Sequence, residues 1–159
     1  MYADAAPVLD APVLRRYGEP EYVRGAQPAA AAHFTQAIGG GYLTRLVTVF
    51  ARLVTDATAA NRTVLLEYRD EAARRWHIDG APVTQPASTT TDWSWSAFRG
   101  QPDWTVDDTV MLALSPVLLL PTMDFRVFVD NIQAGDQLSL IAFTQERLFP
   151  PNPSPGLPD

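Results

Sequence analysis

The side chains that most often carry out catalysis are scarce in this chain. It has two histidines, His33 and His77, and it has neither cysteine nor lysine. This composition excludes thiolate and lysine nucleophiles, disulfides and cysteine-based metal sites. The chain also lacks the G-x-S-x-G and H-E-x-x-H motifs of common hydrolases. We therefore predict no catalytic residue, and we predict that the protein is not an enzyme.

Acidic residues gather in two places, at Asp107-Asp108 and in the stretch Asp130–Asp136. A calcium ion needs several converging oxygen ligands, and the second stretch lacks the ligand spacing of an EF-hand. Aspartate, asparagine and glycine are also the ordinary residues of turns. We predict a turn here, with no metal and no cofactor.

Four tryptophans are the remaining candidates for binding chemistry. Trp93 and Trp95 are two residues apart, which places both on one face of a strand. That face suits the core, a subunit contact or a sugar-stacking platform, and aromatic residues in a small β domain most often form the core. Trp104 falls in a loop that also contains a proline, so it is the candidate for a surface ligand contact.

The elements that would position these residues are strands. Apolar and polar residues alternate through most of the middle of the chain, and turn residues separate the alternating segments. The segments are Tyr42–Asp56, Arg62–Tyr68, Arg74–Ile78, Ala87–Phe98, Val110–Leu114, Val117–Leu120, Phe125–Asp130 and Leu138–Phe149. In the third segment we expect Trp76 and Ile78 to face inward. Strands joined by short turns, without helices between them, predict an antiparallel β-sandwich, and this number of strands suits a jelly roll.

The prolines predict how the chain is divided. Four of the 14 lie in residues 1–41 and five in the last ten residues. Because proline fixes φ and lacks a backbone donor, we predict an extended arm at 1–41, a β-sandwich domain at 42–149 and a proline-rich tail at 150–159. The arm carries paired apolar and aromatic residues, which suit a docking strand. The predicted docking residues are Val8, Leu9, Val13, Leu14, Tyr17 and Tyr22.

Several strings of the second half resemble small β-rich virion proteins of tailed bacteriophages. They are Ala60–Leu66, Ala87–Thr90, Leu118–Pro121, Phe125–Val127 and Asp130–Gln137, and the resemblance covers about Leu43 to Phe149. It implies a virion structural role and brings no catalytic residue with it. An extended arm on a compact β body also resembles the layout of capsid-decorating proteins, which are often trimeric.

Charge limits the possible partners. The net charge is −6, and the arginines are scattered, whereas a nucleic-acid surface needs a basic patch. The chain lacks an apolar run long enough for a membrane span and lacks the pattern of a signal peptide. We expect a virion protein assembled in the host cytoplasm, with the major capsid protein or other virion subunits as partners and a trimer as the favoured oligomer. A receptor- or glycan-binding fibre module and a neck or tail subunit remain alternatives.

Overall fold

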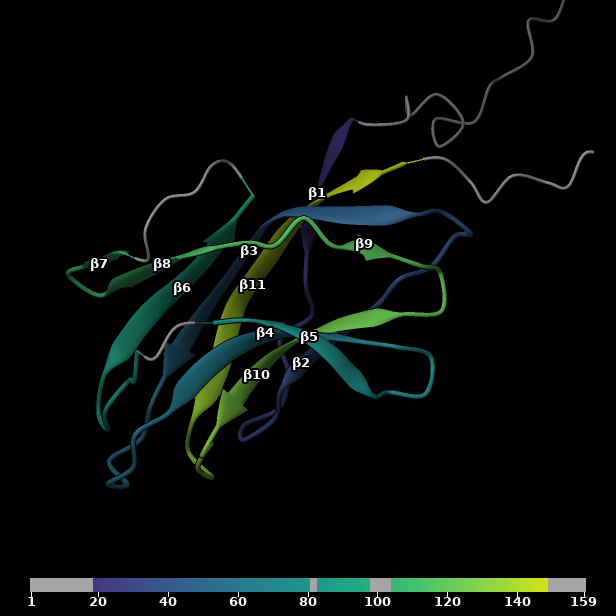
Figure 1. The fold of residues 1–159 in the computed structure, drawn as a ribbon. Helices are drawn as coiled ribbons and strands as arrows, with labels where there is room; N and C mark the ends of the chain where they lie inside the picture. The colour runs from purple at the N-terminus through teal and green to yellow at the C-terminus, as the bar shows by residue number, and fades with distance from the viewer. Residues whose placement is uncertain (1–18, 81–82, 98–103, 149–159) are drawn as a thin grey trace, which may run out of the picture.

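The structure, a computed structural model, describes residues 19–80, 83–97 and 104–148. Every regular element in these residues is a β-strand (Figure 1). The strands are β1 (Pro20–Arg24), β2 (Phe34–Ala37), β3 (Thr44–Val54), β4 (Thr63–Arg69), β5 (Arg75–Asp79), β6 (Thr90–Ser96), β7 (Trp104–Val106), β8 (Thr109–Ala113), β9 (Leu118–Leu119), β10 (Asp124–Asp130) and β11 (Gln137–Arg147).

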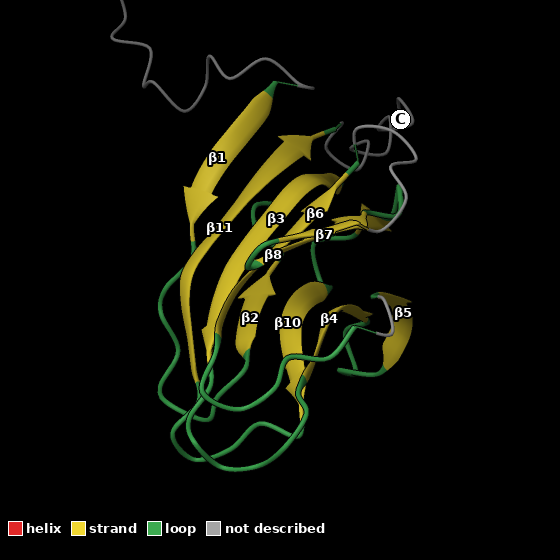
Figure 2. Ribbon diagram, turned by 90° about the vertical axis from the view of Figure 1, so that its left-hand side faces the viewer, coloured by secondary structure: helices red, strands yellow, loops and turns green. Residues whose placement is uncertain are grey.

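The strands form two sheets that face each other (Figure 2). The larger sheet, sheet A, has the order β1-β11-β3-β6-β8-β7, and β9 pairs with the start of β3. The smaller sheet, sheet B, has the order β2-β10-β4-β5. All pairs are antiparallel except β6 and β8, which run parallel. The prediction of an all-β fold is confirmed, and the sheets are mostly antiparallel, with the parallel β6–β8 pair as a departure from the predicted pattern.

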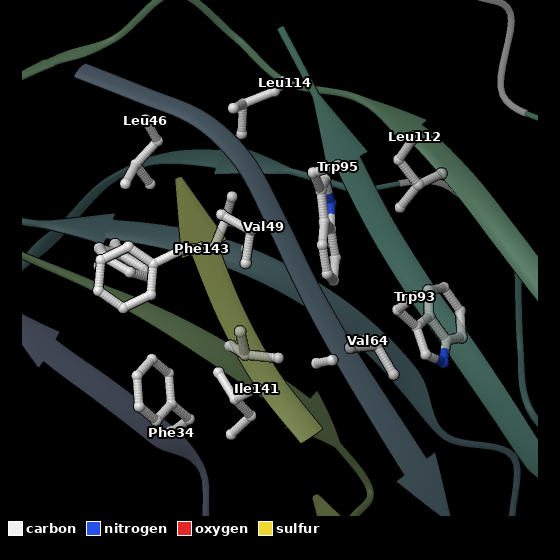
Figure 3. Close-up of a cluster of buried hydrophobic side chains, with 14 of the residues drawn as sticks. Phe34, Leu46, Val49, Val64, Trp93, Trp95, Leu112, Leu114, Ile141 and Phe143 are labelled. Atoms are coloured by element: carbon white, nitrogen blue, oxygen red, sulfur yellow. The ribbon is translucent and has the colours of Figure 1, made fainter. Parts of the chain in front are cut away.

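The core lies between the sheets and follows from the alternation of the strands (Figure 3). Along β4, every second residue from Val64 to Tyr68 (Val64, Leu66 and Tyr68) is fully buried. Trp93 and Trp95 on β6 are also fully buried, so they are core residues. Each such side chain contributes about 1.5–3 kcal/mol by leaving water. The sheets therefore hold together mainly through apolar contact.

Two strands begin earlier than the predicted domain boundary. We expected residues 1–41 to lie outside the β domain, but β1 pairs with β11 in sheet A and β2 pairs with β10 in sheet B. Phe34 and Ile38 belong to the core. The β domain therefore starts at Pro20 within the described residues. The proline at this position is tolerated because β1 is an edge strand.

The inward orientation predicted for Trp76 and Ile78 is wrong. Both side chains are exposed, whereas Asp79 is buried. The register between β4 and β5 shifts after Tyr68, which pairs with His77. His77 and Asp79 pair with Tyr68 and Leu66 and therefore share their inward face. Ile78 pairs with Glu67 and points to the opposite face, and Trp76, next to the register shift, is exposed as well.

Candidate functional site

The predicted docking residues fall mostly outside the part of the chain that the structure describes. Val8, Leu9, Val13, Leu14 and Tyr17 lie in residues 1–18. The sixth, Tyr22, lies on β1 with its side chain 62% exposed. Since Tyr22 pairs with Thr144 of β11, its side chain stands on an edge strand of sheet A.

The residue predicted to contact a surface ligand, Trp104, begins β7. Its backbone pairs with Met111 of β8, and β7 is the last strand of sheet A. The structure does not describe its side chain, so the predicted ligand contact stays a prediction.

A polar cluster surrounds the carboxylate of Asp79. The hydroxyl of Tyr68 donates to Oδ2 at 3.0 Å, the backbone N–H of Ser115 donates to Oδ2 at 2.9 Å, and the hydroxyl of Ser115 donates to Oδ1. His77 Nε2 lies 3.2 Å from Oδ1. Burial, followed by the charge of Asp79, raises the pKa of Tyr68.

A serine relay needs histidine between serine and aspartate, so that the imidazole takes the hydroxyl proton. Here aspartate lies between Ser115 and His77, and the serine hydroxyl bonds to the carboxylate. The cluster joins β4 and β5 to the link between β8 and β9. The prediction that the protein is not an enzyme stays a prediction.

A second cluster is built around Arg62, whose side chain is fully buried. Its Nε and Nη2 donate to the two carboxylate oxygens of Asp136, each at 2.8 Å, and Nη2 also donates to Asp56 at 2.7 Å. Its Nη1 donates to the carbonyl oxygens of Thr58 and Ala60, at 2.9 and 2.6 Å. We call Arg62, Asp136 and Asp56 the Arg62 cluster. A two-point pairing of this kind is among the strongest polar contacts in proteins.

Asp136 is also held by backbone donors. The N–H groups of Gln133 and Asp56 donate to its carboxylate at 2.8 and 2.9 Å. Burial favours the neutral acid, but these bonds and the pairing with Arg62 outweigh burial, and the pKa of Asp136 lies below its ordinary value. Within the described ranges, no group of three or more His, Cys, Asp or Glu side chains is placed to hold a metal ion. Asp136, the last residue of the stretch Asp130–Asp136, links the β10–β11 loop to the β3–β4 loop through its bonds to Asp56 and Arg62.

A cleft of about 380 Å³ opens between β1, β11 and β2. Its apolar lining includes Val23, Ile38 and Phe143, and its polar lining includes Glu21, Gln36, Gln145 and Arg147. We call this the corner cleft. It adjoins a second hollow of about 330 Å³, bordered by Glu21, Tyr22 and Arg147.

Inside the corner cleft three polar side chains converge. Arg147 Nη2 lies 3.1 Å from Glu21 Oε2, and Gln145 Nε2 donates to the same oxygen at 3.4 Å. The side chains of Glu21 and Arg147 are 22% and 41% exposed, so solvent reaches them. Unlike the buried pair of Arg62 and Asp136, this group is in contact with solvent.

Neither group was identified from the sequence, although a signal for the cleft was present. On β11, Phe143, Gln145 and Arg147 share one face, and on β1 so do Val23 and Glu21. On both strands the inward face changes from apolar to polar toward one end. Arg62 gave no such signal, because its partner Asp136 is 74 residues away.

No family model matches the chain, and neither a curated protein nor a solved structure matches it. Among the residues that the structure describes, there is also no helix long and apolar enough to cross a membrane.

Proposed function

We propose that the protein is a non-enzymatic structural subunit of a tailed-bacteriophage particle, acting as a capsid decoration (cement) or minor head protein. It assembles in the host cytoplasm, stays in the virion and binds the major capsid protein or another virion subunit. The observation that carries this proposal is the order of the strands in the two sheets.

The strand order supports a jelly roll. When β7, β8 and β9 are left out, eight strands remain in the described residues. Counted along the chain, sheet A then has the order first, eighth, third, sixth, and sheet B has the order second, seventh, fourth, fifth. A jelly roll winds its strands through two sheets in this order, and the fold is common in viral capsid and lectin domains.

The place where the predicted arm meets the body supports docking through the N-terminal segment. Residues 1–18 lead into β1, and β1 is an edge strand of sheet A. Their sequence contains the apolar pairs Val8-Leu9 and Val13-Leu14. An extended segment with apolar anchors can add a strand to a sheet edge of a neighbouring subunit. Body and arm would then bind together, which raises avidity.

The charge of the chain and its expected oligomer complete the proposal. A net charge of −6 disfavours contact with packaged nucleic acid and suits a position on the outside of a shell. A homo-oligomer is expected, with a trimer favoured, because the capsid-decorating proteins that this layout resembles are often trimeric.

Deletion of residues 1–18 tests the arm without disturbing the sheets, because the deletion ends before β1. The shortened protein should keep the far-ultraviolet circular dichroism and melting temperature of the full chain and should no longer bind capsids purified without this protein. Deletion of residues 150–159 is the matched control and should leave binding unchanged. Full occupancy of capsids by the protein without residues 1–18 would refute docking through the arm.

A further inference from the structure

The inward face of sheet A becomes polar at one corner. Phe143 on β11 is buried in the core, but Gln145 and Arg147 occupy the next positions on that face. On β1 the inward face changes in the same way, from the apolar Val23 to the charged Glu21. Inward positions of a sandwich are normally apolar, and polar groups are retained there where they have a function or reach solvent.

The corner cleft has the size and composition of a small-molecule site. Its volume of about 380 Å³ lies in the usual range of ligand pockets. Val23, Ile38 and Phe143 contribute apolar surface next to the core. The polar groups come from three strands, which gives a ligand several directions of contact.

The charges in the cleft select the class of ligand. Glu21 and Arg147 pair with each other at 3.1 Å, so together they carry no net charge. A free anion would have to compete with Glu21 for the guanidinium, and a free cation would have to compete with Arg147 for the carboxylate. An uncharged ligand with hydroxyl groups avoids this competition.

The hydrogen-bonding groups suit neighbouring hydroxyls. Glu21 supplies acceptors, Arg147 supplies donors, and the amides of Gln36 and Gln145 supply both. Each hydroxyl of a sugar both donates and accepts, and the C–H face of a pyranose ring is apolar. We propose that the corner cleft binds a neutral saccharide. This site is separate from Trp104, and the inference does not depend on the proposed particle role.

The test is a titration of the full chain, followed by isothermal calorimetry and saturation-transfer NMR. The probes are glucose, galactose, mannose, N-acetylglucosamine and disaccharides built from them. Sialic acid represents acidic saccharides, and a peptide with the sequence of residues 8–17 represents an extended polypeptide. At least one neutral saccharide should bind, and sialic acid and the peptide should not compete with it.

Two variants assign the binding to the cleft. Glu21→Gln keeps the shape of the side chain and removes its charge, and Gln145→Leu removes the amide. Each should weaken saccharide binding by about tenfold or more, which corresponds to one lost hydrogen bond to a charged or polar group. Glu71→Gln, on an exposed turn, is the matched control and should bind like the unchanged protein.

Three results would overturn the inference: no neutral saccharide binds, sialic acid or the peptide binds in its place, or both cleft variants bind as well as the unchanged protein. Melting temperatures of the variants separate lost binding from lost folding. If Gln145→Leu does not fold, the isosteric Glu21→Gln variant decides the question alone.

Discussion

The two ends of the sandwich both place charged residues near the space between the sheets, but with opposite consequences. At one end Arg62 and Asp136 are both fully buried and satisfy each other with two hydrogen bonds. At the other end Glu21 and Arg147 form an ion pair at 3.1 Å and remain partly exposed. Strands β3 and β11 connect the two ends. The comparison indicates that the first group stabilises the fold, whereas the second lies where we propose a binding site.

The two ends differ in the free energy that each ion would lose if its partner were removed. When a buried ion loses its partner, no water can take the partner's place, so breaking the pair greatly lowers the free energy of unfolding. When a partly exposed ion loses its partner, water solvates it instead, so breaking the pair costs little. The same residue types can therefore stabilise the fold at one end and line the proposed binding site at the other.

The largest expected effect is that of Arg62→Met. This change keeps the apolar stem but leaves Asp136 buried without its partner, so the free energy of unfolding should fall by about 3–5 kcal/mol. Denaturation in guanidinium chloride measures it. The matched change Arg147→Met, at the corner cleft, should cost about 1 kcal/mol or less. Equal losses for the two variants would remove the distinction between the two ends.

The variant Asp136→Asn should cause the next largest loss of stability. The amide keeps the shape but loses the charge, and one hydrogen bond to a charged group is worth about 1.5–3 kcal/mol. Because the pKa of Asp136 is lowered in the folded protein, its contribution is fully present above the ordinary value of 3.8. It is lost as the pH falls through the lowered pKa.

The stability difference between the unchanged protein and Asp136→Asn should therefore shrink in acid. Urea denaturation at a series of pH values from neutral to strongly acidic measures this. A difference that stays constant down to the most acidic conditions would mean that the carboxylate charge does not hold the two loops together.

At the corner, the most sensitive position should be a glycine and not an ion pair. A Cβ added to Gly25 would lie 2.7 Å from the ring of Phe34 and 2.9 Å from Ile141. Overpacking of this kind costs about 1–3 kcal/mol. Gly25→Ala should therefore lower the melting temperature more than Arg147→Met does, and the reverse order would show that the ion pair holds β1 in place.

The smallest effect on stability should come from replacing His33, which belongs neither to the Arg62 cluster nor to the corner cleft. Its Nδ1 accepts the backbone N–H of Val129 at 3.2 Å, and its ring packs on Phe128. Burial, with the nearby charge of Arg126, lowers the pKa of His33, while Glu67 opposes the change. The unfolded chain then takes up the proton first, so stability should decrease as the pH falls below the ordinary value of 6.5.

The variant His33→Gln should show a weaker decrease over this range. Guanidinium denaturation at pH about 7.5 and about 5.5 compares the two proteins on either side of the ordinary histidine pKa. An unchanged slope in the variant would assign the pH dependence to other groups.

The sequence predicted the elements whose pattern is local. The alternation of Val64, Leu66 and Tyr68 and that of Phe125, Val127 and Val129 place those residues in the core, as observed. Period-2 patterning needs only neighbouring residues to be read. The all-β class followed from the same patterns.

The sequence did not predict what depends on distant partners. β1 is a strand because β11 pairs with it, and Pro20 pairs with Glu146 at the far end of the chain. The outward side chains of β5 follow from its pairing with β4, which places His77 and Asp79 opposite the inward residues of that strand and which no local pattern marks. Arg62 and Asp136 likewise become a pair only when the two loops meet.

Quantitative mass spectrometry of particles tests the proposed function most directly. The particles are purified after lysis of the cells that produce the protein, and its amount is measured relative to the major capsid subunit. A decoration or minor head protein should be present in a fixed ratio that persists through further purification. Absence of the protein from purified particles would rule out a structural role in the virion.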